Sequence, residues 1–309
     1  MLSSFIMQTQ LDTAMLITDK TQITLLPKRK KERIWEIDFL RGICVILMIL
    51  DHLALLLGEN FGYSWYGYGF YDKGLGDAFT RFCYVWADSP ARDVLHPIVL
   101  FIFFSISGIS CSFSRSNAKR GIQLAVIALI YTACSYIAQE LIGIPGTLVT
   151  FGVLHFLATC ILIYALILFI GNNNKAVTVV ASAAIIIVTL CLYFLYTPPA
   201  DTSKFFAIVF PPRDFYGNKT LFYSQSEISP GDLFTLIPYS AFFFAGTLLA
   251  PFLYGSKRSL LPSLNRAWQK PVSFIGRHAL LIYVLHMVLL SGLLAVITYL
   301  FIVPGSFGF

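Results

Sequence analysis

Long apolar stretches alternate with short polar ones along most of the chain. Each stretch approaches the roughly 20 residues that an α-helix needs to cross the hydrocarbon layer of a membrane. Seven of them can be read, at about residues 38–58, 94–113, 122–143, 149–170, 176–197, 232–254 and 277–303. The pattern predicts an all-α, polytopic membrane protein with about seven transmembrane helices and no internal repeat.

The composition agrees with this pattern. Of 309 residues, 57% are hydrophobic and only 12% are charged, and the mean hydropathy is +0.74. These values exclude an ordinary water-soluble domain. Five of the six cysteines fall inside predicted spans, so neither a disulfide framework nor a metal site is expected. We expect residues 1–33 to form a flexible basic tail and residues 34–309 to form one transmembrane domain.

Basic residues predict the orientation, because Lys and Arg collect on the cytoplasmic side of membrane helices. The basic segments at 27–33, 114–121 and 255–270 all fall on one side of a seven-span arrangement. The N-terminus is therefore predicted to be cytoplasmic, with long outer loops at about 59–93 and 198–231. Insertion and anionic lipid account for the net charge of +6 without a nucleic-acid partner.

The first predicted span, "DFLRGICVILMILDHLALLLG", carries four ionisable residues: Asp38, Arg41, Asp51 and His52. Charges inside a bilayer are costly and usually face a protein interior or a wet cavity. Arg41 and His52 are eleven residues apart, so they share one stripe of the helix at a separation of about 16 Å. Asp51 points about 100° away from His52. A polar group on a neighbouring helix is therefore better placed than Asp51 to orient the His52 imidazole.

Several candidate catalytic groups fall in the outer half of the predicted membrane. His52 is the candidate general base, because the unperturbed pKa of histidine, about 6.5, lies near working pH. His155 and Asp232 are predicted to orient the base or the acceptor, and His96 lies at the outer start of the second span. The alternative for His52 is a buried histidine that only hydrogen-bonds across helices.

Arginines and lysines gather on the predicted cytoplasmic side, where they suit the phosphates of a ligand. They are Arg41, Arg115, Lys119, Arg120, Lys257, Arg258 and Arg277. Membrane orientation alone also explains such loops, and Arg41 has the alternative of reaching the interface beside Asp38. His286, in the last span, is either close to the path of a thioester or hydrogen-bonded to another helix.

Small residues recur in the second span. Ser105, Gly108 and Ser112 follow one another at spacings of three and four residues. This spacing lets helix backbones approach closely in a membrane, so we predict a packing surface here.

A set of five segments resembles the bacterial relatives of the heparan-α-glucosaminide N-acetyltransferase catalytic-domain family, within the transmembrane acyltransferase superfamily. The segments are "EIDFLRGICVILMILDH" (36–52), "FIFFSISGISCSFSR" (101–115), "FGVLHFLATCIL" (151–162), "DLFTLIPYSAFFFAGTLLAP" (232–251) and "FIGRHALLIYVLHMVLL" (274–290). The Arg and His of the first span match the motif of the wider superfamily. The resemblance covers about residues 34–292.

The resemblance implies an acetyltransferase of the bacterial cytoplasmic membrane that takes acetyl-CoA from the cytosol and acetylates a sugar or glycan on the far side. Arg41, Arg115, Arg120, Arg277 and His286 would then bind the donor, with His52, His155 and Asp232 catalytic. Two departures occur. Tyr239 stands where the family often has Trp. The loop 59–93 lacks the histidine that the lysosomal branch uses.

Two other classes of function are compatible with the same residues. Intramembrane His, Asp and Arg also mark the ion pathways of transporters, and a non-catalytic subunit of a polysaccharide machine would need none of these groups for chemistry. The sequence leaves open the identity of the acceptor and whether oxygen or nitrogen is acylated. It also leaves open which of His52, His96 and His155 is the base, and whether the chain forms a homodimer.

Overall fold

A computed structural model describes most of the chain after the predicted tail. It covers residues 34–62, 65, 75–144, 146–196, 208–210, 229 and 231–302. The tail at 1–33 and most of the outer loop at 198–231 lie outside the described residues.

The described residues form an all-α protein, and seven of their helices are long and apolar enough to cross a membrane. These are α2 with its π-helical extension η1 (Trp35–Leu55, Leu56–Phe61), α5 (Pro90–Cys111), α6 with η2 (Asn117–Tyr136, Ile137–Leu141), α7 (Val153–Ile170), α8 (Lys175–Leu195), α10 (Leu236–Leu253) and α12 with η5 (Ala279–Ile297, Thr298–Ile302). The remaining helices are α4 (Leu75–Ala87), η3 (Pro262–Leu264), η4 (Ala267–Gln269) and α11 (Lys270–Arg277). The predicted fold class and number of spans are confirmed.

Polar residues at the ends of the apolar stretches start three of these helices. The Ser89 and Ser116 hydroxyls accept backbone N–H groups at the starts of α5 and α6. The Asn174 side chain does the same for α8. Such caps satisfy N–H groups that have no partner within a helix.

Residues 59–93, predicted as an outer loop, contain the additional helix α4. Its 13 residues are too few to cross a membrane. It packs beside α2 and η1, where Cys83 is buried against Leu56 and Leu57. This helix was not predicted from the sequence, because its apolar positions repeat over too few turns to be distinguished from the surrounding loop.

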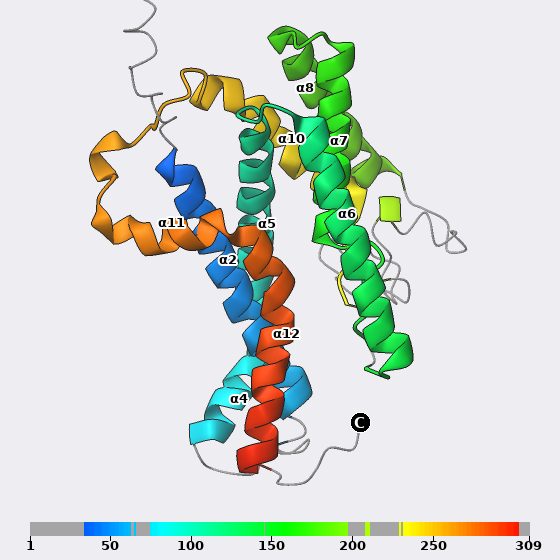
Figure 1. Cartoon of the computed structure of the whole chain (residues 1–309), viewed down its shortest axis with the longest axis vertical. Coiled ribbons are helices and arrows are strands. Elements are labelled where there is room, and N and C mark those ends of the chain that lie inside the picture. Colours follow the sequence, from blue (N-terminus) through cyan, green and yellow to red (C-terminus); the bar gives the residue numbers. More distant parts are fainter. Residues whose placement is uncertain are drawn as a thin grey trace, which may run out of the picture. The chain divides into compact units, whose positions relative to one another are not determined.

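The helices that carry the ionisable residues lie next to one another. α2 contacts α5, α11 and α12, and α6 pairs with α7 (Figure 1). A core of aromatic rings joins α5, α7 and α10. In this core Phe104 stacks at a tilt on Phe156, with ring centroids 4.7 Å apart.

Glycines bring two helix pairs into backbone contact. A Cβ atom on Gly108 would collide with the carbonyl oxygen of Phe243, and one on Gly246 with that of Ser105, where α5 crosses α10. This confirms the packing surface predicted for the second span. At the crossing of α2 and α11, a Cβ atom on Gly276 would likewise collide with the Asp38 carbonyl oxygen.

We predict that Gly246→Ala lowers the midpoint of thermal unfolding in detergent. The added methyl group must displace the backbone of α5, a strain that typically costs about 1–3 kcal/mol. Gly292→Ala is the matched control, since a Cβ atom at Gly292 meets nothing within 4 Å. The midpoint of the control should stay the same or rise slightly, because Ala favours a helix over Gly. Equal midpoints for the two variants would contradict the close crossing.

Candidate active site

His52 and His286 form a pair between α2 and α12. Nε2 of His286 lies 3.3 Å from Nδ1 of His52, and the ring centroids are 5.0 Å apart. A polar group on a neighbouring helix therefore orients His52, as predicted. His286, seven residues after the start of α12, makes the hydrogen bond to another helix that was one of its two predicted alternatives.

The carbonyl groups around the pair determine which nitrogens carry protons. Nδ1 of His286 lies 2.6 Å from the carbonyl oxygen of Tyr283, and Nδ1 of His52 lies 3.0 Å from that of Met48. A carbonyl oxygen only accepts, so in the neutral rings both Nδ1 atoms carry hydrogen. Nε2 of His286 is then the acceptor for His52. The lone pair of His52 stays on Nε2, the nitrogen that a general base would use.

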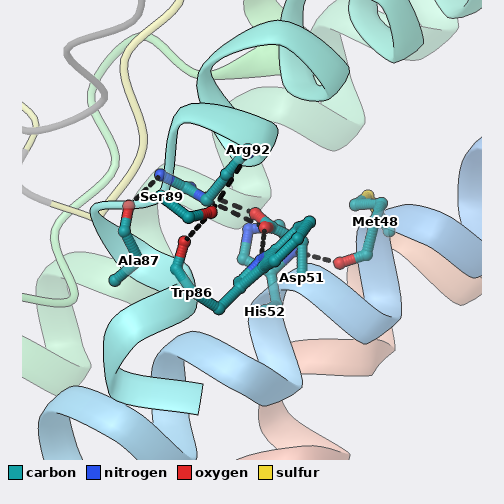
Figure 2. Close-up of polar contacts among 7 residues, drawn as sticks. All are labelled: Met48, Asp51, His52, Trp86, Ala87, Ser89 and Arg92. Carbon is teal, nitrogen blue, oxygen red and sulfur yellow. Dashed lines mark hydrogen bonds and ion pairs between the residues drawn. The ribbon is translucent and has the colours of Figure 1, made fainter. Parts of the chain in front are cut away.

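Asp51 does not contact this pair, because other groups hold its carboxylate. Arg92 donates from Nε to Oδ1 at 2.9 Å and from Nη2 to Oδ2 at 3.1 Å, while the Trp86 indole donates to Oδ1 at 2.8 Å (Figure 2). Arg92 also reaches the carbonyl oxygen of Ala87. A buried charge needs a partner of this kind, and the clamp joins α2 to the start of α5.

A cavity of about 480 Å³ opens beside the histidine pair. We call it the histidine cavity. Its ionisable lining residues are Asp51, His52, Arg92, His96, Tyr131, Asp232, Tyr283 and His286. Apolar side chains form most of the remaining wall. Among the described residues, no group of three or more His, Cys, Asp or Glu side chains is arranged to hold a metal ion.

A second cavity, of about 590 Å³, is lined by three of the predicted donor-binding arginines. We call it the arginine cavity. Arg41, Arg120 and Arg277 converge on it from α2, α6 and α11. Arg41 also donates to the Ser110 hydroxyl at 2.6 Å and lies 3.6 Å from the Asp38 carboxylate. The guanidinium groups make the walls of this cavity suited to anions.

The two cavities adjoin. Phe103, Val153 and Tyr283 line both of them. These three side chains therefore lie between a molecule in the arginine cavity and the histidine pair.

Two non-helical segments, residues 146–152 before α7 and residues 231–235 before α10, lie within the depth of the spanning helices. Thr132 donates to the carbonyl oxygen of Val149 at 2.8 Å, although α6 and η2 continue for nine further residues, or about 14 Å. The chain therefore turns back alongside α6 before α7 begins. Backbone groups of this kind are tolerated in a membrane only inside protein or beside a cavity.

These two segments satisfy each other's backbone groups. Gly231 donates to the Leu148 carbonyl at 2.9 Å, and Phe234 to that of Phe151 at 3.1 Å. The Ser229 hydroxyl accepts from the backbone N–H of Thr150 at 2.9 Å. Phe151 and Leu233 form a parallel bridge.

Asp232 connects the start of α7, which follows the first segment, to α12. Its Oδ2 atom accepts from the backbone N–H of Val153 at 3.1 Å and from the hydroxyl of Tyr283 at 2.8 Å. The carboxylate lines the histidine cavity but makes no direct bond to His52.

Two predicted site residues lie away from both cavities. His155 is 3.1 Å from the Thr132 hydroxyl, and because that hydroxyl donates elsewhere, His155 must donate from Nε2. Arg115 is exposed, and neither residue belongs to a cavity lining. Their predicted roles stay predictions, without support from a shared cavity. His286 lines the histidine cavity and not the arginine cavity, and its predicted role in donor binding stays a prediction.

Sequence reasoning missed Arg92, Trp86 and Tyr283. Arg92 precedes the second predicted span, which was expected to begin at residue 94, whereas in the structure it lies in the first turn of α5. Its pairing with Asp51 depends on how the start of α5 packs against α2. The signal available for Tyr283 was its position one turn before His286 in the last span. Nothing in the sequence relates it to Asp232.

Fold and site together define a polytopic helical membrane protein with two adjoining cavities, one that contains three arginines and the other a histidine pair. Residues 33–288 match the family described as heparan-alpha-glucosaminide N-acetyltransferase, catalytic. The chain belongs to this family, which indicates a membrane acetyltransferase. No curated protein and no solved structure matches the chain.

Proposed function

We propose that the protein moves an acetyl group from acetyl-CoA in the arginine cavity to the hydroxyl or amino group of a sugar in the histidine cavity. The observation that carries this proposal is the adjacency of the two cavities, which share Phe103, Val153 and Tyr283. Membership of an acetyltransferase family supports both the donor and a glycan acceptor.

The arginine cavity provides for the donor. Coenzyme A carries several phosphate charges, and guanidinium groups bind phosphate through paired N–H groups. Arg41, Arg120 and Arg277 reach the cavity from three different elements, so they can contact different phosphates of one ligand. Arg41 keeps its contact with Ser110, which limits the movement of its guanidinium group.

The histidine cavity provides for proton transfer. Nε2 of His52 takes the proton from the acceptor as its oxygen or nitrogen attacks the thioester carbonyl carbon. The new C–O or C–N bond forms, the C–S bond breaks, and the CoA thiolate leaves. The proton then passes from His52 to the thiolate, so no net proton is gained or lost. His286 stabilises the transient imidazolium by accepting from Nδ1 of His52.

The same geometry fits the predicted orientation. With the N-terminus cytoplasmic, Arg41 lies toward the cytoplasm and His52 about 16 Å further out along α2. Acetyl-CoA would then enter from the cytoplasm, and the acceptor from the other face. A bacterial cytoplasmic membrane remains the predicted location.

The histidine assignment is tested by single-turnover acetyl transfer in detergent, with labelled acetyl-CoA and a panel of amino sugars and neutral sugars. His52→Ala and His52→Gln should slow transfer by roughly 10²- to 10⁴-fold, the range expected for loss of a general base. Acetyl-CoA binding should survive in both. Capture of label by any sugar would separate the enzyme from a transporter and from a non-catalytic subunit.

The control for this experiment is His278→Ala, because His278 is exposed and lines neither cavity. His96→Ala and His155→Ala belong in the same series, since each was a candidate base. Near-normal transfer by folded His52→Ala would remove His52 from the chemistry.

Donor binding is tested with Arg41→Ala. A charge-assisted contact is worth roughly 1.5–3 kcal/mol, so the affinity for acetyl-CoA should fall by roughly 10- to 150-fold. Arg115→Ala is the matched variant, and we expect a smaller loss because Arg115 is exposed and outside the cavity. Sealed inside-out vesicles should bind the donor and right-side-out vesicles should not. Equal affinities of Arg41→Ala and the wild type for acetyl-CoA would show that Arg41 does not bind the donor and would favour the alternative, in which it only reaches the membrane interface.

A further inference from the structure

Three side chains separate the two cavities, and we call the place where they meet the passage. Phe103 from α5, Val153 at the start of α7 and Tyr283 from α12 are the side chains common to both linings. Phe103 and Val153 are apolar, and Tyr283 is the only one of the three with a polar group. Whatever moves from the arginines to the histidine pair passes these side chains.

The order of residues along the chain agrees with this placement. Arg277 is six residues before Tyr283, and His286 is three residues after it. On α12, Tyr283 therefore lies one turn before the histidine, on the side from which the donor would come. Its ring centroid is 5.7 Å from that of His286.

Tyr283 is held in position at both ends. Its hydroxyl donates to Oδ2 of Asp232 at 2.8 Å, and its carbonyl oxygen accepts from Nδ1 of His286. Asp232 also binds the backbone N–H of Val153. One carboxylate thus connects two of the three residues at the passage, so the passage cannot widen at Tyr283 unless the hydrogen bond to Asp232 breaks.

We propose that Tyr283 determines which acyl groups are transferred, passing acetyl and excluding longer chains. This inference rests on the proposed acetyl transfer. A two-carbon acyl group adds only a methyl to the thioester carbonyl, whereas each further methylene must also pass Phe103, Val153 and the hydrogen-bonded ring of Tyr283. Asp232 acts as a positioning residue that keeps the phenol ring across the passage.

The test compares acetyl-, butanoyl- and hexanoyl-CoA as donors in detergent, with glucosamine as the probe acceptor. Release of the CoA thiol is also measured with water as the only acceptor, so a result does not depend on the sugar. The wild type should turn over acetyl-CoA far faster than hexanoyl-CoA. Tyr283→Ala should lower the acetyl-to-butanoyl ratio of kcat/KM by roughly tenfold or more, the scale of one methylene in a fitted pocket.

Further variants separate size from positioning. Tyr283→Phe keeps the ring but loses the bond to Asp232, and should relax the ratio less than Tyr283→Ala does. Tyr283→Leu carries the same expectation as Tyr283→Ala if the latter does not fold. Tyr136→Ala is the matched control, because Tyr136 is 53% exposed and lines neither cavity. Its rates and ratio should equal those of the wild type.

The outcomes distinguish the two proposals. Equal turnover of acetyl- and hexanoyl-CoA by the wild type, or an unchanged ratio in the folded Ala or Leu variant, would overturn the role of Tyr283 while leaving acetyl transfer intact. Failure of the wild type to release CoA from any donor would refute the proposed function, and the inference would fall with it.

Discussion

Backbone groups that leave helical geometry inside a hydrocarbon layer must find hydrogen-bond partners within the protein. The site depends on how this chain meets that requirement. The segments on either side of Phe151 and Leu233 pair with each other, and Asp232 receives the first N–H of α7. Because these groups have hydrogen-bond partners, α7 can begin beside the middle of α6, and the start of α7 lines the histidine cavity. A continuous helix here would fill that space with side chains.

Charge is the second constraint on the same region. Asp51 and Arg92 neutralise each other. Two hydrogen bonds from Arg92 and one from the Trp86 indole engage both carboxylate oxygens of Asp51. The carboxylate is therefore not free to bind the neighbouring imidazole. His52 instead contacts His286 through Nδ1, which leaves Nε2 of His52 for the role we propose. Replacing either charged residue alone would leave an unpaired charge in a low-dielectric setting, a costly change.

Much of the fold followed from the sequence because lipid imposes a simple rule. Spans of about 20 apolar residues and the positions of small residues in α5 depend on local sequence alone, and both were predicted. The shared stripe of Arg41 and His52 followed from helical periodicity. The missed contacts have no such local signal. Asp232 lies 51 residues before Tyr283 and meets it only because its segment packs against the start of α7. His155 was grouped with His52 because residue counts give a depth in the membrane but not a position around the helix bundle.

The grouping of Arg41 and His52 on one helix has a mechanical consequence. α2 runs from Trp35 to Leu55 without a break in its helical course, so movements of the other helices cannot change the distance between these two residues. The helix therefore fixes the separation of the two residues along its axis at about 16 Å. In the reaction we propose, a donor held by its charged end at Arg41 would need a flexible arm of about this length to reach His52. One helix would then set the length of donor that fits, whereas side chains from several helices set the width of the passage.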